Sequence, residues 1–159
     1  MGENDILFWF FLLYNDASGT CLARNNPQAS MNGEYKMRIL ICDDDLLIVE
    51  KLQKYLKGYF SHLHLKCPEI VCFSDGESLL ADQGDKDILF LDIEMPGLDG
   101  IYVGNELKKK EKDIIIFIIT SYSEYLDEAM RFHVFRYLSK PIDRQRLFRN
   151  LKDALDLYH

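Results

Sequence analysis

Positive charge, paired cysteines and repeats are all scarce in this 159-residue chain, and each scarcity excludes a class of protein. Lys and Arg number 19 against 26 Asp and Glu, and the net charge of -7 argues against broad nucleic-acid binding by this chain alone. The four cysteines form no Cys-x-x-Cys pair, and two lie in apolar runs, which favours a reducing cytoplasm. We find no internal repeat and no low-complexity segment. The length suits one well-buried domain and is too short for two ordinary ones.

Long hydrophobic runs are also lacking. The apolar run at residues 6–14 has only nine residues, which is too short to span a bilayer, and no Lys or Arg precedes it, so it is a poor secretion signal. We therefore expect no membrane association. A polar, turn-rich segment then leads to a second methionine, Met37. We predict a domain at residues 37–159. Residues 1–36 are then an N-terminal extension or sequence that lies upstream of the natural start. In the alternative, they belong to the protein and their apolar run packs onto the domain.

From Met37 onward, short apolar runs alternate with helical patterns. Runs without polar alternation are typical of strands that are buried on both faces. Gly58 or the turn that follows it is expected to end the first helix, and Ser74 to Glu77 is a capping-box sequence before the second. The predicted strands are 38–42, 70–73, 88–91, 114–119 and 134–138, and the predicted helices are about 45–58, 74–80, 99–110, 123–132 and 143 to the end.

Five strands alternating with helices predict an α/β fold with a parallel sheet covered on both faces, because each crossover lays its helix on one side. In such a sheet the functional site lies outside the carboxyl ends of the strands. Polar residues follow the apolar runs at these ends: Asp43 and Asp44 after the first strand, Asp92 after the third, Thr120 after the fourth and Lys140 after the fifth. We expect these five side chains to share one rim.

The chemistry of this rim follows from its charges. Three neighbouring carboxylates repel one another, so that one keeps its proton or a cation enters. Oxygen ligands at an open site favour Mg²⁺, which takes few protein ligands and keeps several waters. Asp92 can act as a nucleophile toward a phosphoryl donor, while Lys140 and Thr120 hold the phosphoryl oxygens.

With these residues placed, four segments in the right order are similar to the receiver domain of two-component response regulators. They are Ile41–Asp45, Leu91–Gly100, Thr120–Ser121 and Tyr137–Pro141. The resemblance implies a flavodoxin-like (βα)5 doubly wound sheet of strand order 2-1-3-4-5. It also implies a cytoplasmic phosphoprotein that a sensor histidine kinase phosphorylates, and no turnover of external substrates.

The resemblance assigns roles to individual residues. It implies that Asp92 is the phosphoacceptor and a Mg²⁺ ligand, that Asp44 binds Mg²⁺ directly and Asp43 mainly through water, and that Glu94 contributes its backbone carbonyl. It further implies that Thr120 and Lys140 contact the phosphoryl group.

The same resemblance implies a switch and a structural detail. Thr120 moves toward the phosphoryl group and Tyr137 rotates into the space it leaves, although an aromatic residue in a strand is as readily a core residue. The peptide bond before Pro141 is expected to be cis.

A narrower similarity is to regulators that carry a LytTR DNA-binding domain. It rests on Cys42–Asp45, Asp92–Gly100 and Phe135–Asp143. No basic output domain follows His159, so we expect a receiver cut from a longer transcription regulator, or else a stand-alone receiver, with DNA contacted only through the missing domain. A homodimer is expected through the 123–132 helix, the 134–138 strand and the last helix.

Two other functions are compatible with these residues. One is an aspartate-nucleophile phosphatase, for which Glu94 fills the general-acid spacing imperfectly and the chain is short for a substrate cap. The other is a phosphorylation-independent interaction module of the same fold.

Overall fold

A computed structural model describes residues 36–157 of the chain. Within this range, five parallel strands form one sheet in the order β2-β1-β3-β4-β5, which confirms the predicted fold class and strand order. The proposed extension at residues 1–36, with its apolar run at 6–14, lies outside the described residues except for Lys36. The strands are β1 (Arg38–Cys42), β2 (Glu69–Phe73), β3 (Ile88–Leu91), β4 (Ile115–Thr120) and β5 (Arg136–Ser139).

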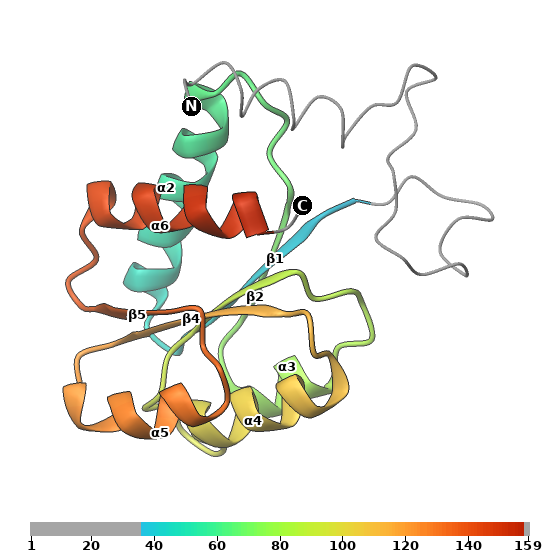
Figure 1. Cartoon of the computed structure of the whole chain (residues 1–159), viewed down its shortest axis with the longest axis vertical. Coiled ribbons are helices and arrows are strands. Elements are labelled where there is room, and N and C mark those ends of the chain that lie inside the picture. The colour runs from blue at the N-terminus through green and yellow to red at the C-terminus, as the bar shows by residue number, and fades with distance from the viewer. Residues whose placement is uncertain (1–35, 158–159) are drawn as a thin grey trace. The chain divides into compact units, whose positions relative to one another are not determined.

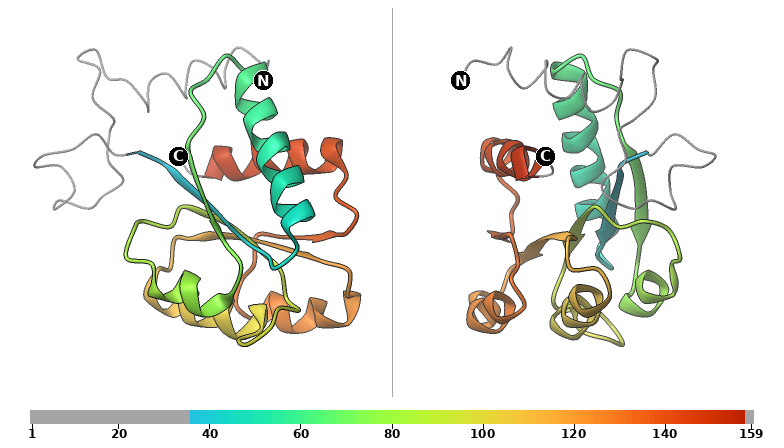
Figure 2. Two further views of the ribbon diagram at one scale, coloured as in Figure 1. Left: turned by 180° about the vertical axis from the view of Figure 1, so that it is seen from behind. Right: turned by 45° about the vertical axis from the view of Figure 1, so that its right-hand side comes forward.

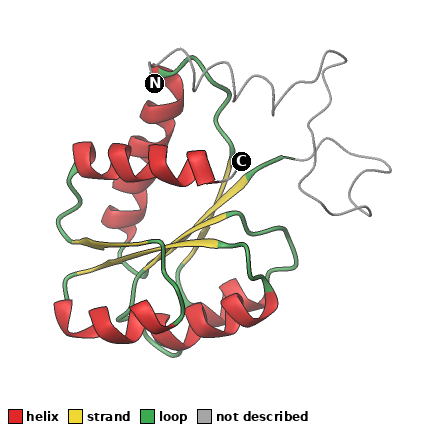
Figure 3. Ribbon diagram, in the orientation of Figure 1, coloured by secondary structure: helices red, strands yellow, loops and turns green. Residues whose placement is uncertain are grey.

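Helices cover both faces of this sheet. They are α2 (Leu46–His62), α3 (Gly76–Ala81), α4 (Gly100–Lys110), the 3-10 turn η2 (Ser123–Tyr125), α5 (Leu126–Arg131) and α6 (Arg144–Leu157). In Figure 1, α2 and α6 lie on one face, and α3, α4 and α5 lie on the other. The two further views in Figure 2 agree, and Figure 3 shows the strands as a layer between the helices. No helix within residues 36–157 is long and apolar enough to cross a membrane.

The alternation of side chains along each strand builds a core on both faces of the sheet. Leu40, Leu89 and Ile116 are fully buried and pack in one cluster with Leu107 of α4 and Phe132 after α5. The residues between them point to the other face, where Phe90 and Phe117 stack with ring centroids 4.7 Å apart. Each buried side chain of this size stabilises the fold by about 1.5–3 kcal/mol relative to exposure, so both helical layers are held by burial.

Of the two predicted end points of the first helix, Gly58 is wrong, and the helix ends about one turn later. The helix runs to His62 because Tyr59 and Phe60 are buried and continue its apolar face. A Cβ atom at Gly58 would meet nothing within 4 Å, so the glycine lies in open space. The cost of about 1 kcal/mol for glycine in a helix is smaller than the gain from burying the two aromatic side chains.

The predicted capping box at Ser74 is also wrong. The N-cap of α3 is Asp75, whose Oδ1 accepts a hydrogen bond of 2.7 Å from the Ser78 backbone N–H. Glu77 instead accepts a hydrogen bond of 3.2 Å from the Leu98 N–H, which ties α3 to the loop after β3. The other boundaries differ by a few residues, and the predicted 123–132 helix divides into η2 and α5.

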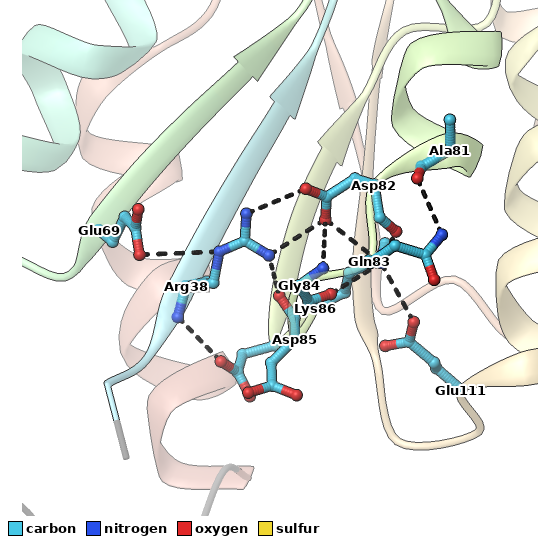
Figure 4. A network of polar contacts seen from close by, with 10 residues as sticks. Arg38, Glu69, Ala81, Asp82, Gln83, Gly84, Asp85, Lys86 and Glu111 are labelled. Atoms are coloured by element: carbon cyan, nitrogen blue, oxygen red, sulfur yellow. Dashed lines mark hydrogen bonds and ion pairs between the residues drawn. The ribbon is translucent and has the colours of Figure 1, made fainter. Parts of the chain in front are cut away.

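At the amino ends of the strands, a network of ion pairs surrounds Arg38 and Lys86 (Figure 4). Arg38 contacts Asp82 at 3.1 Å, and its hydrogen bond to this carboxylate lowers the pKa of Asp82. Lys86, whose side chain is only 5% exposed, lies 3.4 Å from both Asp82 and Glu111. The network joins the start of β1 to the segments before β3 and β4, at the edge opposite the polar rim.

Candidate functional site

Three carboxylates meet where β1 and β3 end. Asp43 and Asp92 are buried, with 3% and 5% of their surfaces exposed, while Asp44 is exposed. One oxygen atom from each lies within 4.8 Å of the others. Among residues 36–157 this is the one group of three or more acidic, histidine or cysteine side chains found close enough to hold a metal ion. The predicted clustering of these acids at the carboxyl edge is therefore present.

Backbone hydrogen bonds position the two buried acids. Asp43 donates its N–H to the Phe73 carbonyl at 3.1 Å, and Asp92 donates its N–H to the Cys42 carbonyl at 2.9 Å. These bonds extend the sheet ladders one residue past the strands, so the carboxylates leave the sheet at its edge. A Cβ atom at Gly100 would lie 2.1 Å from the Asp92 carbonyl oxygen, so only glycine lets the start of α4 approach this closely.

Lys140 joins the two buried acids from the end of β5. Its Nζ lies 2.8 Å from Asp43 Oδ2 and 3.3 Å from Asp92 Oδ2. Its backbone N–H donates to the Thr120 carbonyl at 2.9 Å, and the Lys140–Pro141 peptide bond is cis. The chain thus brings a cation from β5 to carboxylates from β1 and β3.

Burial and charge act in opposite directions on these groups. Burial, reinforced by the negative charge of Asp43, raises the pKa of Asp92 from 3.8 to about 6, although Lys140 acts against the rise. Burial alone would lower the pKa of Lys140, but its hydrogen bond to Asp43 and the charges of both acids outweigh burial and raise it. At neutral pH, Lys140 is therefore charged and Asp92 is mostly ionised. Ionising Asp92 in this buried position lowers the free energy of unfolding.

Thr120 and Tyr137 lie on neighbouring strands beside this cluster. Thr120 is the last residue of β4, is 1% exposed, and its Oγ1 accepts a hydrogen bond of 3.3 Å from the Tyr122 N–H. Tyr137, on β5, is half-buried and donates its hydroxyl to the Tyr122 carbonyl. Burial raises the pKa of Tyr137. Both residues therefore contact the backbone of Tyr122, just after β4.

The Glu94 side chain is exposed and makes a contact that the sequence did not reveal. Its Oε1 accepts a hydrogen bond of 3.3 Å from the Tyr125 hydroxyl. Hydrogen bonding to Glu94 raises the pKa of Tyr125 and also that of Tyr122. No periodic pattern links residues 94 and 125, and only the loop after β4 brings them together.

The donor set of this rim is suited to a hard cation. Carboxylate oxygens are the ligands that Mg²⁺ prefers, and the exposed Asp44 leaves one side open to water and to a ligand. Cys42 does not compete as a soft ligand, because burial, with nearby acids reinforcing it, raises the pKa of its thiol to about 12. The residues therefore fit a hydrated divalent metal beside one anionic group.

Comparison with known proteins places this geometry in context. Residues 39–152 match the family model described as the response regulator receiver domain. The chain is 30% identical over 118 residues to sensory transduction protein LytT of Bacillus subtilis, covering 73% of this chain and 47% of LytT. It is 35% identical over 120 residues to the positive alginate biosynthesis regulatory protein of Pseudomonas aeruginosa, covering 74% and 47%. The chain spans less than half the length of these curated relatives.

Solved structures of response regulators superpose on this chain. The response regulatory domain of protein MrkE from Klebsiella pneumoniae superposes with a TM-score of 0.69 at 25% identity, covering 77% of this chain and 98% of that domain. Response regulator protein TrrA from Thermotoga maritima, solved in complex with Mg(2+)-BeF, superposes with a TM-score of 0.64 at 33% identity, covering 74% and 97%.

Proposed function

Because the chain belongs to the response regulator receiver family, we propose that Asp92 accepts a phosphoryl group from a sensor histidine kinase in a Mg²⁺-dependent reaction. The observation that carries the proposal is the position of Lys140, whose Nζ lies 2.8 Å from Asp43 and 3.3 Å from Asp92. Buried acids from two strands and a cation from a third thus converge on a partly exposed rim, which suits the binding and transfer of an anionic group.

The metal would be held by oxygen atoms of the same rim. Asp44 and Asp92 would bind Mg²⁺ directly, Asp43 mainly through water, and Glu94 through its backbone carbonyl. When bound, Mg²⁺ would supply positive charge that offsets the repulsion among these acids and the incoming phosphoryl oxygens.

The residues of the chain then divide the work of transfer. An Asp92 carboxylate oxygen attacks the phosphorus atom, a phosphorus–oxygen bond forms, and the bond from phosphorus to the donor histidine nitrogen breaks. Lys140 and Thr120 contact the phosphoryl oxygens and orient them. Later attack by water returns the carboxylate and releases phosphate, so the chain acts on its own aspartate and not on external substrates.

Phosphorylation would be transmitted through Thr120 and Tyr137. The modification adds nearly two negative charges beside Lys140. Thr120 would move toward the new group, and Tyr137 would release its contact with the Tyr122 carbonyl and turn inward. A nearly complete shift between two states requires a differential stabilisation of about 5.5 kcal/mol, so we expect a partial shift.

The output would appear on the surface formed by α5, β5 and α6. This surface carries mixed charge suited to a homodimer: Asp127, Glu128, Arg131, Arg136, Asp143, Arg144, Arg146 and Arg149. The likeness to LytT and to the alginate regulator supports an output in transcription regulation through a LytTR-type DNA-binding domain. The cytoplasm, where histidine kinases present their donors, is the proposed compartment.

The test is to incubate the chain with Mg²⁺ and acetyl phosphate and to measure its intact mass. The native chain should gain one phosphoryl group, Asp92→Asn should gain none, and the matched control Asp45→Asn should behave as the native chain, because Asp45 caps α2. An equal gain in Asp92→Asn would place the acceptor elsewhere. Failure to trap phosphoryl or beryllofluoride would favour a phosphorylation-independent module, and turnover of a phosphomonoester would favour a phosphatase.

A further inference from the structure

Next to the acidic rim, a pocket of about 340 Å³ lies between α4 and the η2–α5 segment and shares Glu94 with the rim. Its volume is at the small end of the range for ligand sites, about the size needed for a single side chain or a small molecule. The polar and aromatic lining consists of Glu94, Asp99, Tyr102, Asn105, Tyr125 and Glu128. The lining contains three acids and no Lys or Arg.

Contacts within the chain leave this negative charge without a cation. Among residues 36–157, none of the ion pairs involves a carboxylate of the pocket. Lys109, on α4, pairs instead with Glu106 at 2.6 Å. Asp99 caps α4 by accepting from the Tyr102 N–H at 2.9 Å, and Glu94 accepts from the neutral Tyr125 hydroxyl. The pocket therefore retains unbalanced negative charge beside two aromatic rings.

The chemistry of the lining selects a particular cation. A guanidinium is planar, stacks on aromatic faces and donates paired hydrogen bonds to carboxylates, whereas an ammonium is a strongly hydrated point charge. Tyr102 and Tyr125 supply the aromatic surface, Glu94 and Glu128 supply carboxylates from two different elements, and Asn105 supplies an amide oxygen. We propose that this pocket receives the arginine side chain of a protein partner.

The openness of the pocket favours a protein over a free small molecule. Glu94, Tyr102 and Glu128 are all exposed, so a small cation would keep much of its hydration and would gain little from entering. An arginine held by its own polypeptide has already lost part of its freedom and has neighbouring residues to add contact area. The pocket is present in the unphosphorylated chain, so its test requires neither Mg²⁺ nor a phosphoryl donor.

The test is an NMR titration of the full chain with N-acetylarginine amide, which mimics an arginine side chain within a peptide. The backbone amide signals of Tyr102, Asn105 and Tyr125 should shift with saturation. Glu128→Lys should weaken binding by about tenfold or more, because a charge-assisted hydrogen bond is replaced by repulsion. Asp127→Lys, with the same charge change on the same helix but outside the pocket lining, should bind nearly as the native chain does.

Three outcomes would overturn the proposal. Equal weakening in Glu128→Lys and Asp127→Lys would mean that the arginine derivative senses only overall charge. Equal affinity for N-acetyllysine amide would remove the case for a guanidinium. Tighter binding of free arginine than of the blocked derivative would show that the pocket recognises the α-ammonium or α-carboxylate, which identifies a small molecule and not a protein as its occupant.

Discussion

Replacing Asp92 by Asn should stabilise the fold at neutral pH when no divalent metal is present. The carboxylate is 5% exposed and lies beside the buried Asp43, so its ionised form is disfavoured and its pKa rises from 3.8 to about 6. Above pH 6 this rise corresponds to a penalty on the order of 3 kcal/mol, because a tenfold change in proton affinity is worth about 1.4 kcal/mol. Asparagine keeps an oxygen that can accept from the Ile93 N–H, as Asp92 does at 2.8 Å.

The pH dependence gives the prediction its sign. The folded protein binds a proton at Asp92 more tightly than the unfolded chain does, so the contribution of Asp92 to the free energy of unfolding falls as the pH rises from about 4 to about 6 and is then constant. The advantage of Asp92→Asn should be on the order of 3 kcal/mol above pH 7, about half of that at pH 5, and smaller still at pH 4.

Urea unfolding of both proteins at pH 5 and pH 7.5, in a chelating buffer, measures this difference. Asp44→Asn is the matched control, because its carboxylate belongs to the same cluster but is exposed, and it should change the stability much less. Saturating Mg²⁺ should shrink the advantage of Asp92→Asn, because a metal that binds the folded native chain stabilises it. An Asp92→Asn protein that is no more stable than the native chain at pH 7.5, or an advantage that is the same at both pH values, would refute the reasoning.

Three further predictions concern the packing around the site, which has a helix glycine as its control, and the opposite edge of the sheet. In a chelating buffer, Lys140→Met should lower the free energy of unfolding by about 3 kcal/mol, because it leaves two buried carboxylates without their cation. Adding Mg²⁺ should restore part of this loss. A melting temperature equal to that of the native chain would contradict the prediction. Gly100→Ala should lower the free energy of unfolding in urea by more than about 2 kcal/mol, because its Cβ atom would lie 2.1 Å from the Asp92 carbonyl oxygen. Gly58→Ala, where the Cβ atom enters open space within a helix, should raise the free energy of unfolding by about 1 kcal/mol. Lys86→Met should destabilise the fold by about 3 kcal/mol in thermal unfolding and should leave phosphorylation at the opposite edge of the sheet unchanged. If a folded Lys86→Met protein no longer reacts with acetyl phosphate, the two edges are coupled and the prediction is wrong.

The elements and the approximate site could be predicted because they depend on local patterns and on one general rule. Unbroken apolar runs predicted the buried strands, and alternation with helices predicted a parallel sheet. Since parallel strands end at the same edge, Asp43, Asp92 and Lys140 were expected together, and the structure places them within ion-pair distance. The family resemblance supplied the strand order, which the periodicity of the chain does not contain.

The wrong predictions at Gly58 and Glu77 have the same physical cause: a local sequence pattern does not determine which distant residues a side chain contacts. Gly58 carries a helix-stop signal, but burial of Tyr59 and Phe60 outweighs it. Glu77 fits a capping box, but the loop after β3 offers the Leu98 N–H, and Asp75 caps the helix.

The sequence by itself determined that acidic, hydroxyl and ammonium groups gather at the carboxyl edge of a parallel sheet, because these residues follow the apolar runs and parallel strands all end at the same edge. Only the tertiary structure decided that Asp43 and Asp92 are buried while Asp44 is exposed, and that Tyr125 reaches Glu94 to border an acidic pocket. Exposure and contacts between loops depend on how helices of particular length and shape pack against the sheet, and no spacing along the chain records that packing.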